Sequence, residues 1–138
     1  GQNEIWRVDL AGGAPVQVTT AGGLEARESP DGKWLYYTKP TTPGIFRRAL
    51  QGGLEQRLPS LQPTGRHWDV GPQGISYVAD DKLLLYDTAT GESRQLGKLE
   101  RPATGGGRGL SVGPDGSLLY LQIDTFRREL MQGEIAPD

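Results

Sequence analysis

Short runs of apolar and β-branched residues alternate with turn residues along the whole chain. No segment keeps apolar residues at helical spacing over about ten positions. Gly, Pro and Asp separate the runs, as expected where strands are joined by tight turns. The pattern therefore predicts an all-β protein. Strands are expected at 4–10, 15–19, a short run from Leu24, 34–38, 45–53 with its turn, 55–58, 67–70, 75–79, 83–87, 93–96, 110–112, 118–123 and 130–135.

One turn motif recurs at a fixed spacing. Ser-Pro-Asp-Gly at 29–32 returns as Gly-Pro-Gln-Gly at 71–74 and as Gly-Pro-Asp-Gly at 113–116, so that its prolines are 42 residues apart. In such a turn Pro presets φ, Asp caps the turn, and Gly adopts the positive φ that closes it. A period of about 40–45 residues with four strands is the signature of a β-propeller blade. We therefore predict a partial β-propeller of about three and a half four-stranded antiparallel blades.

The period divides the chain into a half-blade and three further units. A lone four-stranded sheet cannot bury both of its faces, so the blades must stack on their neighbours. The predicted units are the half-blade 1–20 and the blades 21–61, 62–101 and 102–138. The residues expected in the core between blades include Leu35, Tyr37, Ile45, Tyr77, Leu84, Leu119 and Leu130.

Composition excludes several classes of protein. The net charge is −2, with 15 basic and 17 acidic residues well mixed, which argues against a nucleic-acid-binding surface. No apolar run approaches the roughly 18 residues of a membrane span, and no signal-peptide pattern is visible, so membrane insertion is not expected. A periplasmic and a cytoplasmic location both stay open. Cys is absent, which excludes disulfides and Cys-based metal sites.

The ordered motifs resemble a known family. The turn at 29–33, followed by Ile45-Phe46-Arg47 and the glycines at 52–53, resembles the WD40-like repeat of TolB-type β-propellers. The second half, through 68–70, 74–78, 86–91, 109–116 and 119–124, is similar to the C-terminal end of the propeller attached to bacterial winged-helix regulators and some Ser/Thr kinases. The resemblance implies that several blades precede Gly1, because closed propellers have about 4–8 blades.

The same resemblance implies a function without catalysis. We expect a module for protein binding or scaffolding, part of a sensor or regulatory protein, with no cofactor. Two alternatives stay open: a propeller fragment of a larger enzyme such as a serine peptidase, and a propeller that binds a sugar or another small ligand. The protein partner is not indicated by the sequence. Open end blades expose apolar faces and unpaired edges, so self-association into a homo-oligomer is also expected.

Catalytic and metal-binding patterns are weak. Ser29 or Ser111, His67 and one of the aspartates 31, 69 and 115 could form a hydrolase triad on paper, but there is one His and no Gly-x-Ser-x-Gly motif. The glycines at 105–107 lack the Lys-Ser/Thr of a phosphate-binding loop. Asp80, Asp81 and Asp124 lack the spacing of a calcium loop. We therefore expect no catalytic residue and no metal site.

One positional inference follows from the 42-residue register. Residues at the start of each blade's first strand should lie around the mouth of the central channel, where loops of one face commonly bind ligands. A ring of Arg and His there could bind an anionic group. The alternative, which the balanced charges favour, is that the cations pair with Glu25, Glu28 and Asp69. The predicted binding residues at this mouth are Arg27, Arg66, His67, Asp69 and Arg108.

Overall fold

The computed structural model describes residues 2–103 and 108–120. Within these residues the regular structure is made of twelve strands, and no helix occurs. The strands are β1 (Trp6–Arg7), β2 (Val16–Gln17), β3 (Leu24–Glu28), β4 (Trp34–Thr38), β5 (Phe46–Ala49), β6 (Gln56–Arg57), β7 (Trp68–Gly71), β8 (Gly74–Ala79), β9 (Lys82–Tyr86), β10 (Ser93–Lys98), β11 (Leu110–Val112) and β12 (Leu118–Tyr120).

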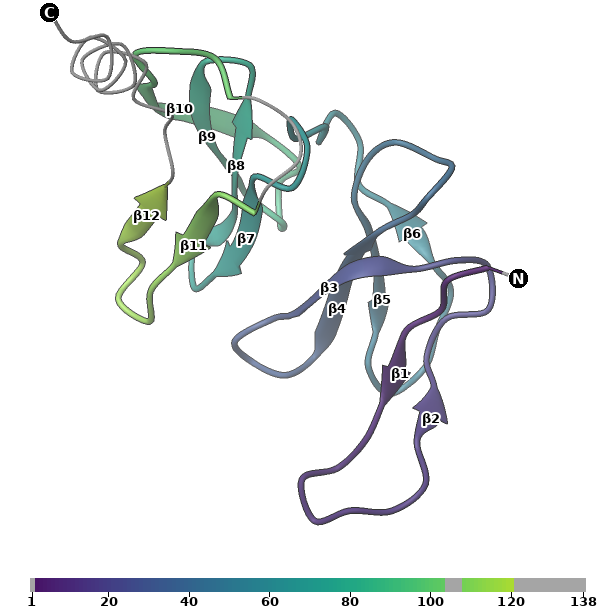
Figure 1. Ribbon diagram of the computed structural model, residues 1–138. Helices are drawn as coiled ribbons and strands as arrows, with labels where there is room; N and C mark the ends of the chain where they lie inside the picture. The colour runs from purple at the N-terminus through teal and green to yellow at the C-terminus, as the bar shows by residue number, and fades with distance from the viewer. Residues whose placement is uncertain (1, 104–107, 121–138) are drawn as a thin grey trace, which may run out of the picture.

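The strands form four antiparallel sheets that follow one another along the chain. Two are four-stranded, in the orders β3-β4-β5-β6 and β7-β8-β9-β10, so each strand pairs with its neighbour in sequence. The other two, β1-β2 and β11-β12, are two-stranded and lie at opposite ends (Figure 1). The prediction of an all-β protein with repeated four-stranded antiparallel sheets is confirmed at this level.

Most of the predicted strand positions agree with the structure to within one or two residues. The runs at 34–38 and 110–112 coincide with β4 and β11. The first strand, predicted over 4–10, is regular only at Trp6–Arg7, where it forms a two-stranded hairpin with β2. The predicted strand at 130–135 and the end of the one at 118–123 lie outside the described residues.

The recurring turn owes its shape to Asp31 and Gly32. The Asp31 carboxylate accepts hydrogen bonds from the Ser29 hydroxyl (2.5 Å) and from the Lys33 N–H (3.0 Å). These hydrogen bonds, the Ser29 one foremost, lower the pKa of Asp31 below its ordinary value. Gly32 adopts a φ of 72° and its N–H donates to the Ser29 carbonyl, which closes the turn. A short side chain and a glycine therefore set the register of β3 against β4.

The middle copy of the turn is tighter. Gly71 and Gly74 lie directly opposite each other in the ladder between β7 and β8. Gly74 has a φ of 135°, and a Cβ atom built on it would lie 2.2 Å from the carbonyl oxygen of Tyr86. The hairpin therefore approaches the end of β9 so closely that only glycine fits.

The core consists of three apolar clusters, one at each contact between successive sheets. The central cluster joins the two four-stranded sheets and includes Tyr36, Ile45, Trp68 and Tyr77. A second cluster joins β1-β2 to the first large sheet, and a third joins the second large sheet to β11-β12. Stacking of sheets is thus what removes the apolar residues from water.

The predicted core residues have mixed outcomes. Leu35, Tyr37, Ile45 and Tyr77 are buried, as predicted, and Leu84 is partly buried. The prediction for Leu119 is wrong, because this residue on β12 is exposed. It points away from the second large sheet, and no described sheet covers that face. The remaining member of the predicted core, Leu130, lies outside the described residues.

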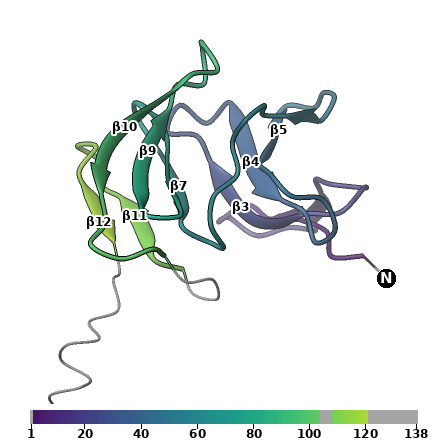
Figure 2. The same ribbon diagram turned by 90° about the horizontal axis from the view of Figure 1, so that it is seen from above.

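From the first large sheet onward, the first strand of each sheet lies close to the first strand of the next. β3 contacts β7, and β7 contacts β11. Seen from above, the sheets follow one another along an arc, with β5 and β10 toward its outer side (Figure 2). The predicted binding residues lie on β3 and β7 or just before β7 and β11, so this arrangement decides which of them meet.

Replacing Gly74 with Ala should destabilise the protein by about 3 kcal/mol, because the added methyl group meets backbone that cannot move away. Gly32→Ala is the matched control. Gly32 also has positive φ, but the nearest atom to a Cβ built on it would be 3.6 Å away, so only the backbone strain of about 1–2 kcal/mol applies. Urea denaturation measures both free energies of unfolding, and equal losses would contradict the assigned close approach.

Candidate functional site

A cluster of charged residues joins the two four-stranded sheets. Arg27 on β3 lies with its Nε 3.3 Å from Oδ1 of Asp69 on β7, and its Nη2 lies 3.4 Å from Oε2 of Glu25. Arg66, just before β7, lies with its Nε 3.4 Å from Oε1 of the same Glu25. Two cations and two carboxylates thus form a chain across the contact between the sheets.

Asp69 also reaches a third sheet. Its Oδ2 accepts a hydrogen bond from the main-chain N–H of Val112 on β11 (2.8 Å), and its Oδ1 accepts one from the N–H of Val70 (2.9 Å). Together with the ion pair to Arg27, one carboxylate connects β3, β7 and β11. Both Asp69 and Arg27 are mostly buried, so solvent screens this contact weakly.

Glu25 owes its position to an irregularity in β3. The ladder between β3 and β4 shifts register between Leu24 and Arg27, and Glu25 has a φ of 50°, in the left-handed region. For a residue other than glycine this conformation costs about 1–2 kcal/mol. Bulges of this kind redirect a side chain, and here the redirected carboxylate lies between Arg27 and Arg66.

Trp68 lies beneath the cluster. The Arg27 guanidinium carbon lies 5.3 Å from the centre of the Trp68 ring, within the range of a cation–π contact. The indole is fully buried, and its N–H makes no hydrogen bond within the described residues. The ring therefore supports Arg27 from below and presents no open face for stacking with a ligand.

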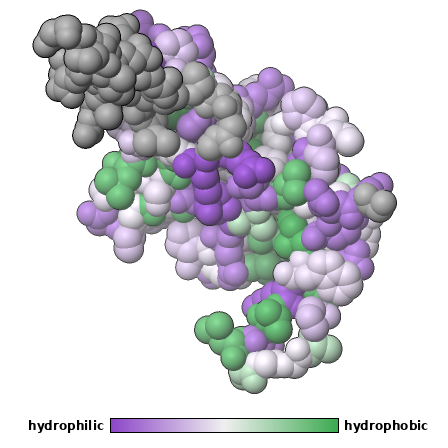
Figure 3. Space-filling view, viewed as in Figure 1, coloured by the Kyte–Doolittle hydropathy of each residue, from purple (hydrophilic) through white to green (hydrophobic). Residues whose placement is uncertain are grey.

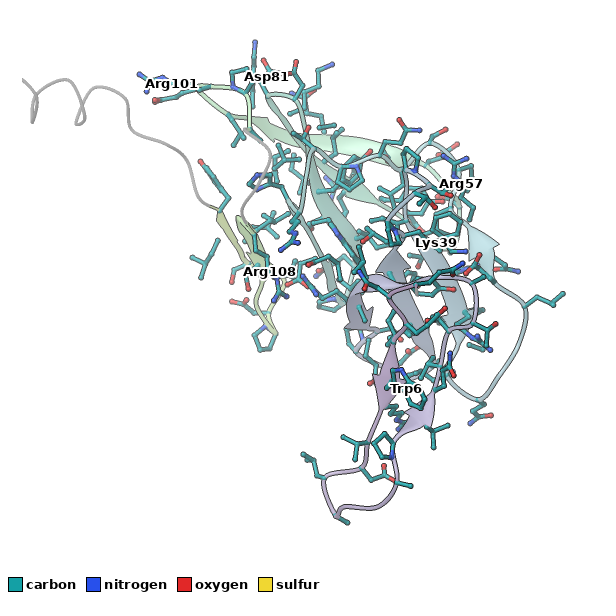
Figure 4. All side chains as sticks on the ribbon, turned by 45° about the vertical axis from the view of Figure 1, so that its right-hand side comes forward. Trp6, Lys39, Arg57, Asp81, Arg101 and Arg108 are labelled. Atoms are coloured by element: carbon teal, nitrogen blue, oxygen red, sulfur yellow. The ribbon has the colours of Figure 1, made fainter. Side chains whose placement is uncertain are left out.

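The structure brings together three of the five predicted binding residues. Arg27, Arg66 and Asp69 share the cluster. His67 directly follows Arg66 in the sequence and is buried. Its main-chain carbonyl accepts a hydrogen bond from the Val78 N–H. Arg108 is exposed near β11 and lines a separate hollow with Leu119 and Tyr120 (Figure 4). The five residues therefore do not form one ring within the described part of the chain.

The predicted pairing of the cations with carboxylates is confirmed for Glu25 and Asp69. Glu28, the third carboxylate considered, makes no ion pair with a described residue. Because the cluster holds equal numbers of positive and negative groups, it offers no excess positive charge to an anion. The left-handed Glu25 and the contact of Asp69 with a main-chain N–H have no signal in the sequence.

A groove lies beside the cluster, between the two four-stranded sheets. It has a volume of about 470 Å³ and is bordered by the loop after β4 and by the connection between β6 and β7. Its lining includes Glu25 and the buried Trp68, together with Arg66, Gln62, Pro43 and Pro63. A groove formed by two loops from different sheets is a common place for a ligand or a partner segment.

The hydrolase triad does not assemble around Ser29. The Ser29 hydroxyl donates a hydrogen bond to Asp31 and accepts one from the N–H of Trp34 (2.9 Å). Both its donor and its acceptor interactions therefore lie within the turn. Asp115 likewise accepts the Ser117 N–H within the third copy of the turn. These polar groups are explained by the turns alone.

Neither a cluster of metal ligands nor a membrane-spanning helix occurs in the described residues. These residues hold no group of three or more His, Cys, Asp or Glu side chains that could bind a metal ion. They also contain no helix with the length and apolar character needed to cross a membrane.

Comparison with known proteins assigns this chain to no family. Neither the known family models nor the curated proteins contain a match to this chain. The resemblance to propeller repeats therefore stays a prediction.

We expect Asp69→Ala to lower the free energy of unfolding by about 2–3 kcal/mol, because it removes one of the two carboxylates that pair with the buried Arg27 and leaves the Val112 N–H without its acceptor. Asp81→Ala is the matched control, since Asp81 pairs with the exposed Lys98 and should cost no more than about 0.5 kcal/mol. Chemical denaturation at neutral pH compares the two. A similar small loss for both variants would show that Asp69 does not connect the sheets.

Proposed function

We propose that this chain forms consecutive blades of a β-propeller that acts as a non-enzymatic protein-binding module. The observation that carries the proposal is the repeated four-stranded antiparallel sheet, stacked face to face with its first strand beside that of the next sheet. Blades stacked around a central axis would bring their first strands together in this way, which supports the proposal. The 42-residue turn period supports it independently.

The proposed binding surface is the rim that carries the groove between the two large sheets. Loops from both sheets border it, while the strands behind them are held by the core and by the Arg27–Asp69 contact. Loops on a rigid scaffold suit recognition of another polypeptide. The rim exposes prolines, a glutamine and Arg66, which suit a polar, extended segment of a partner.

A sugar-binding function is less well supported. Sugar sites of this kind need aromatic rings that are open to the ligand. Trp68 is the aromatic residue that lines the groove, and it is buried under Arg27.

Protein binding at this rim can be tested with a photo-activated crosslinking residue at Gln62, which is exposed and outside the ion-pair cluster. The control carries the same residue at Ala89, in the turn between β9 and β10 at the opposite end of its sheet. Irradiation in the source cells should attach a defined polypeptide at Gln62 and not at Ala89. Equal labelling at both positions, or none at either, would overturn the proposed rim site.

The purified chain should show no turnover of ester, peptide or glycoside substrates above background. The reason is that Ser29 and Asp115 are held in turns and His67 is buried within its sheet. A panel of chromogenic substrates measures this, with His67→Ala as the control. Turnover that disappears in the His67→Ala variant would contradict a non-enzymatic function.

A further inference from the structure

The two end sheets correspond to the two halves of one four-stranded sheet. Ile-Trp-Arg at 5–7 aligns with Ile-Phe-Arg at 45–47, so β1 and β2 correspond to β5 and β6. At the other end, Val112 pairs with Leu118 as Glu28 pairs with Leu35, so β11 and β12 correspond to β3 and β4. One end therefore has strands three and four, and the other has strands one and two.

The outer face of β1 matches a face that is buried in the next repeat. Trp6 corresponds to Phe46, which is 6% exposed because Ile5 and Val18 of the first hairpin cover it. Trp6 itself is 57% exposed, and Val8 on the same face is also exposed. Figure 3 shows apolar residues gathered on this hairpin. The repeat thus indicates that this face is built to be covered by another sheet.

The outer positions of β12 lead to the same conclusion. In the shared register, Leu119 corresponds to Tyr36 and Tyr120 to Tyr37. Tyr36 and Tyr37 are 3% and 0% exposed, whereas Leu119 and Tyr120 are 75% and 50% exposed. In the described residues β12 has β11 as its partner on one side, while β4 has a partner on each side.

We propose that a second copy of this chain completes the end sheet, with its β1 adding beside β12 in the order β11-β12-β1-β2. The intact sheet fixes the register, since Tyr37 is opposite Phe46 and Tyr36 opposite Arg47. The corresponding pairs between chains are Tyr120 with Trp6 and Leu119 with Arg7. The first pair recreates the stacked Tyr37–Phe46 contact, whose ring centres are 6.2 Å apart.

Both faces of the completed sheet are then covered. Trp6 comes to lie on the face that packs against β7–β10 of the first chain, together with Leu118. Leu119 comes to lie on the face that packs against β3–β6 of the second chain, together with Ile5. The same junction forms twice around a two-fold axis, which is the commonest symmetry of protein assemblies.

In this arrangement the described strands of two chains, β1–β12 from each, form six four-stranded sheets. This inference rests on the proposed propeller, and it names one binding partner, a second copy of the same chain.

Light scattering after gel filtration tests the assembly on the full chain. The expected mass is twice the 14.9 kDa of one chain, and Trp6→Asp should shift it to that of a single chain with an unchanged β-type circular dichroism spectrum. Leu54→Asp is the matched control, because Leu54 is an exposed apolar residue outside both end sheets and its replacement should leave the doubled mass.

Cysteine crosslinking tests the register without relying on Trp6→Asp. The chain has no Cys, so Arg7→Cys with Leu119→Cys creates one possible pair, and opposite Cα atoms about 4.5–5.5 Å apart permit a disulfide. Mild oxidation should give a covalent dimer on a non-reducing gel. In the control, Arg7→Cys with Ser117→Cys, the shift of two residues separates the Cα atoms by about 8 Å, so no disulfide should form and the gel should show the mass of a single chain.

The outcomes separate this inference from the proposed function. A folded wild-type monomer at tens of micromolar, assemblies that grow beyond two chains, or equal crosslinking in both cysteine variants would overturn the two-chain ring. None of those results bears on the proposed binding surface at the rim, which crosslinking at Gln62 tests separately. A doubled mass without crosslinking at Gln62 would support the two-chain assembly and contradict partner binding at the rim.

Discussion

A four-stranded sheet whose two faces are both apolar cannot exist alone in water, and this constraint organises the whole molecule. Tyr37 and Phe46 lie on one face of the first large sheet, while Tyr36 and Ile45 lie on the other. Each face is covered by a neighbouring sheet, so the stability of one repeat depends on the presence of the next. The end sheets are where this requirement is met least within the described residues, since their outer side chains remain exposed.

Polar contacts fix how the stacked sheets are placed. Apolar contacts are not directional, whereas the Asp69 carboxylate needs Arg27 on one side and the Val112 N–H on the other. The left-handed Glu25 adds a second carboxylate between Arg27 and Arg66, at a cost in backbone strain. The charged cluster is thus explained by its position between sheets before any ligand is considered.

Much of the fold could be predicted from the sequence because its signals are local. Turn residues at a fixed period predicted the four-stranded sheets, and alternation predicted that Leu35 and Tyr37 are buried. The exposure of Leu119 could not be predicted in this way, since it depends on whether another sheet covers β12. The pairing of Arg27 with Asp69 followed from the register, but the bulge at Glu25 results from tertiary contacts that leave no local pattern.

The Asp69 contact has a consequence for how such a chain can vary over evolutionary time. The Asp69 carboxylate accepts a hydrogen bond from a main-chain N–H of the next repeat, that of Val112. Every residue except proline would supply an N–H at this position. The side chain at the position of Val112 can therefore change without loss of this hydrogen bond. Successive repeats can drift apart in sequence, or be duplicated, without a matching substitution in the neighbour, so the geometry of the stack outlasts its recognisable sequence.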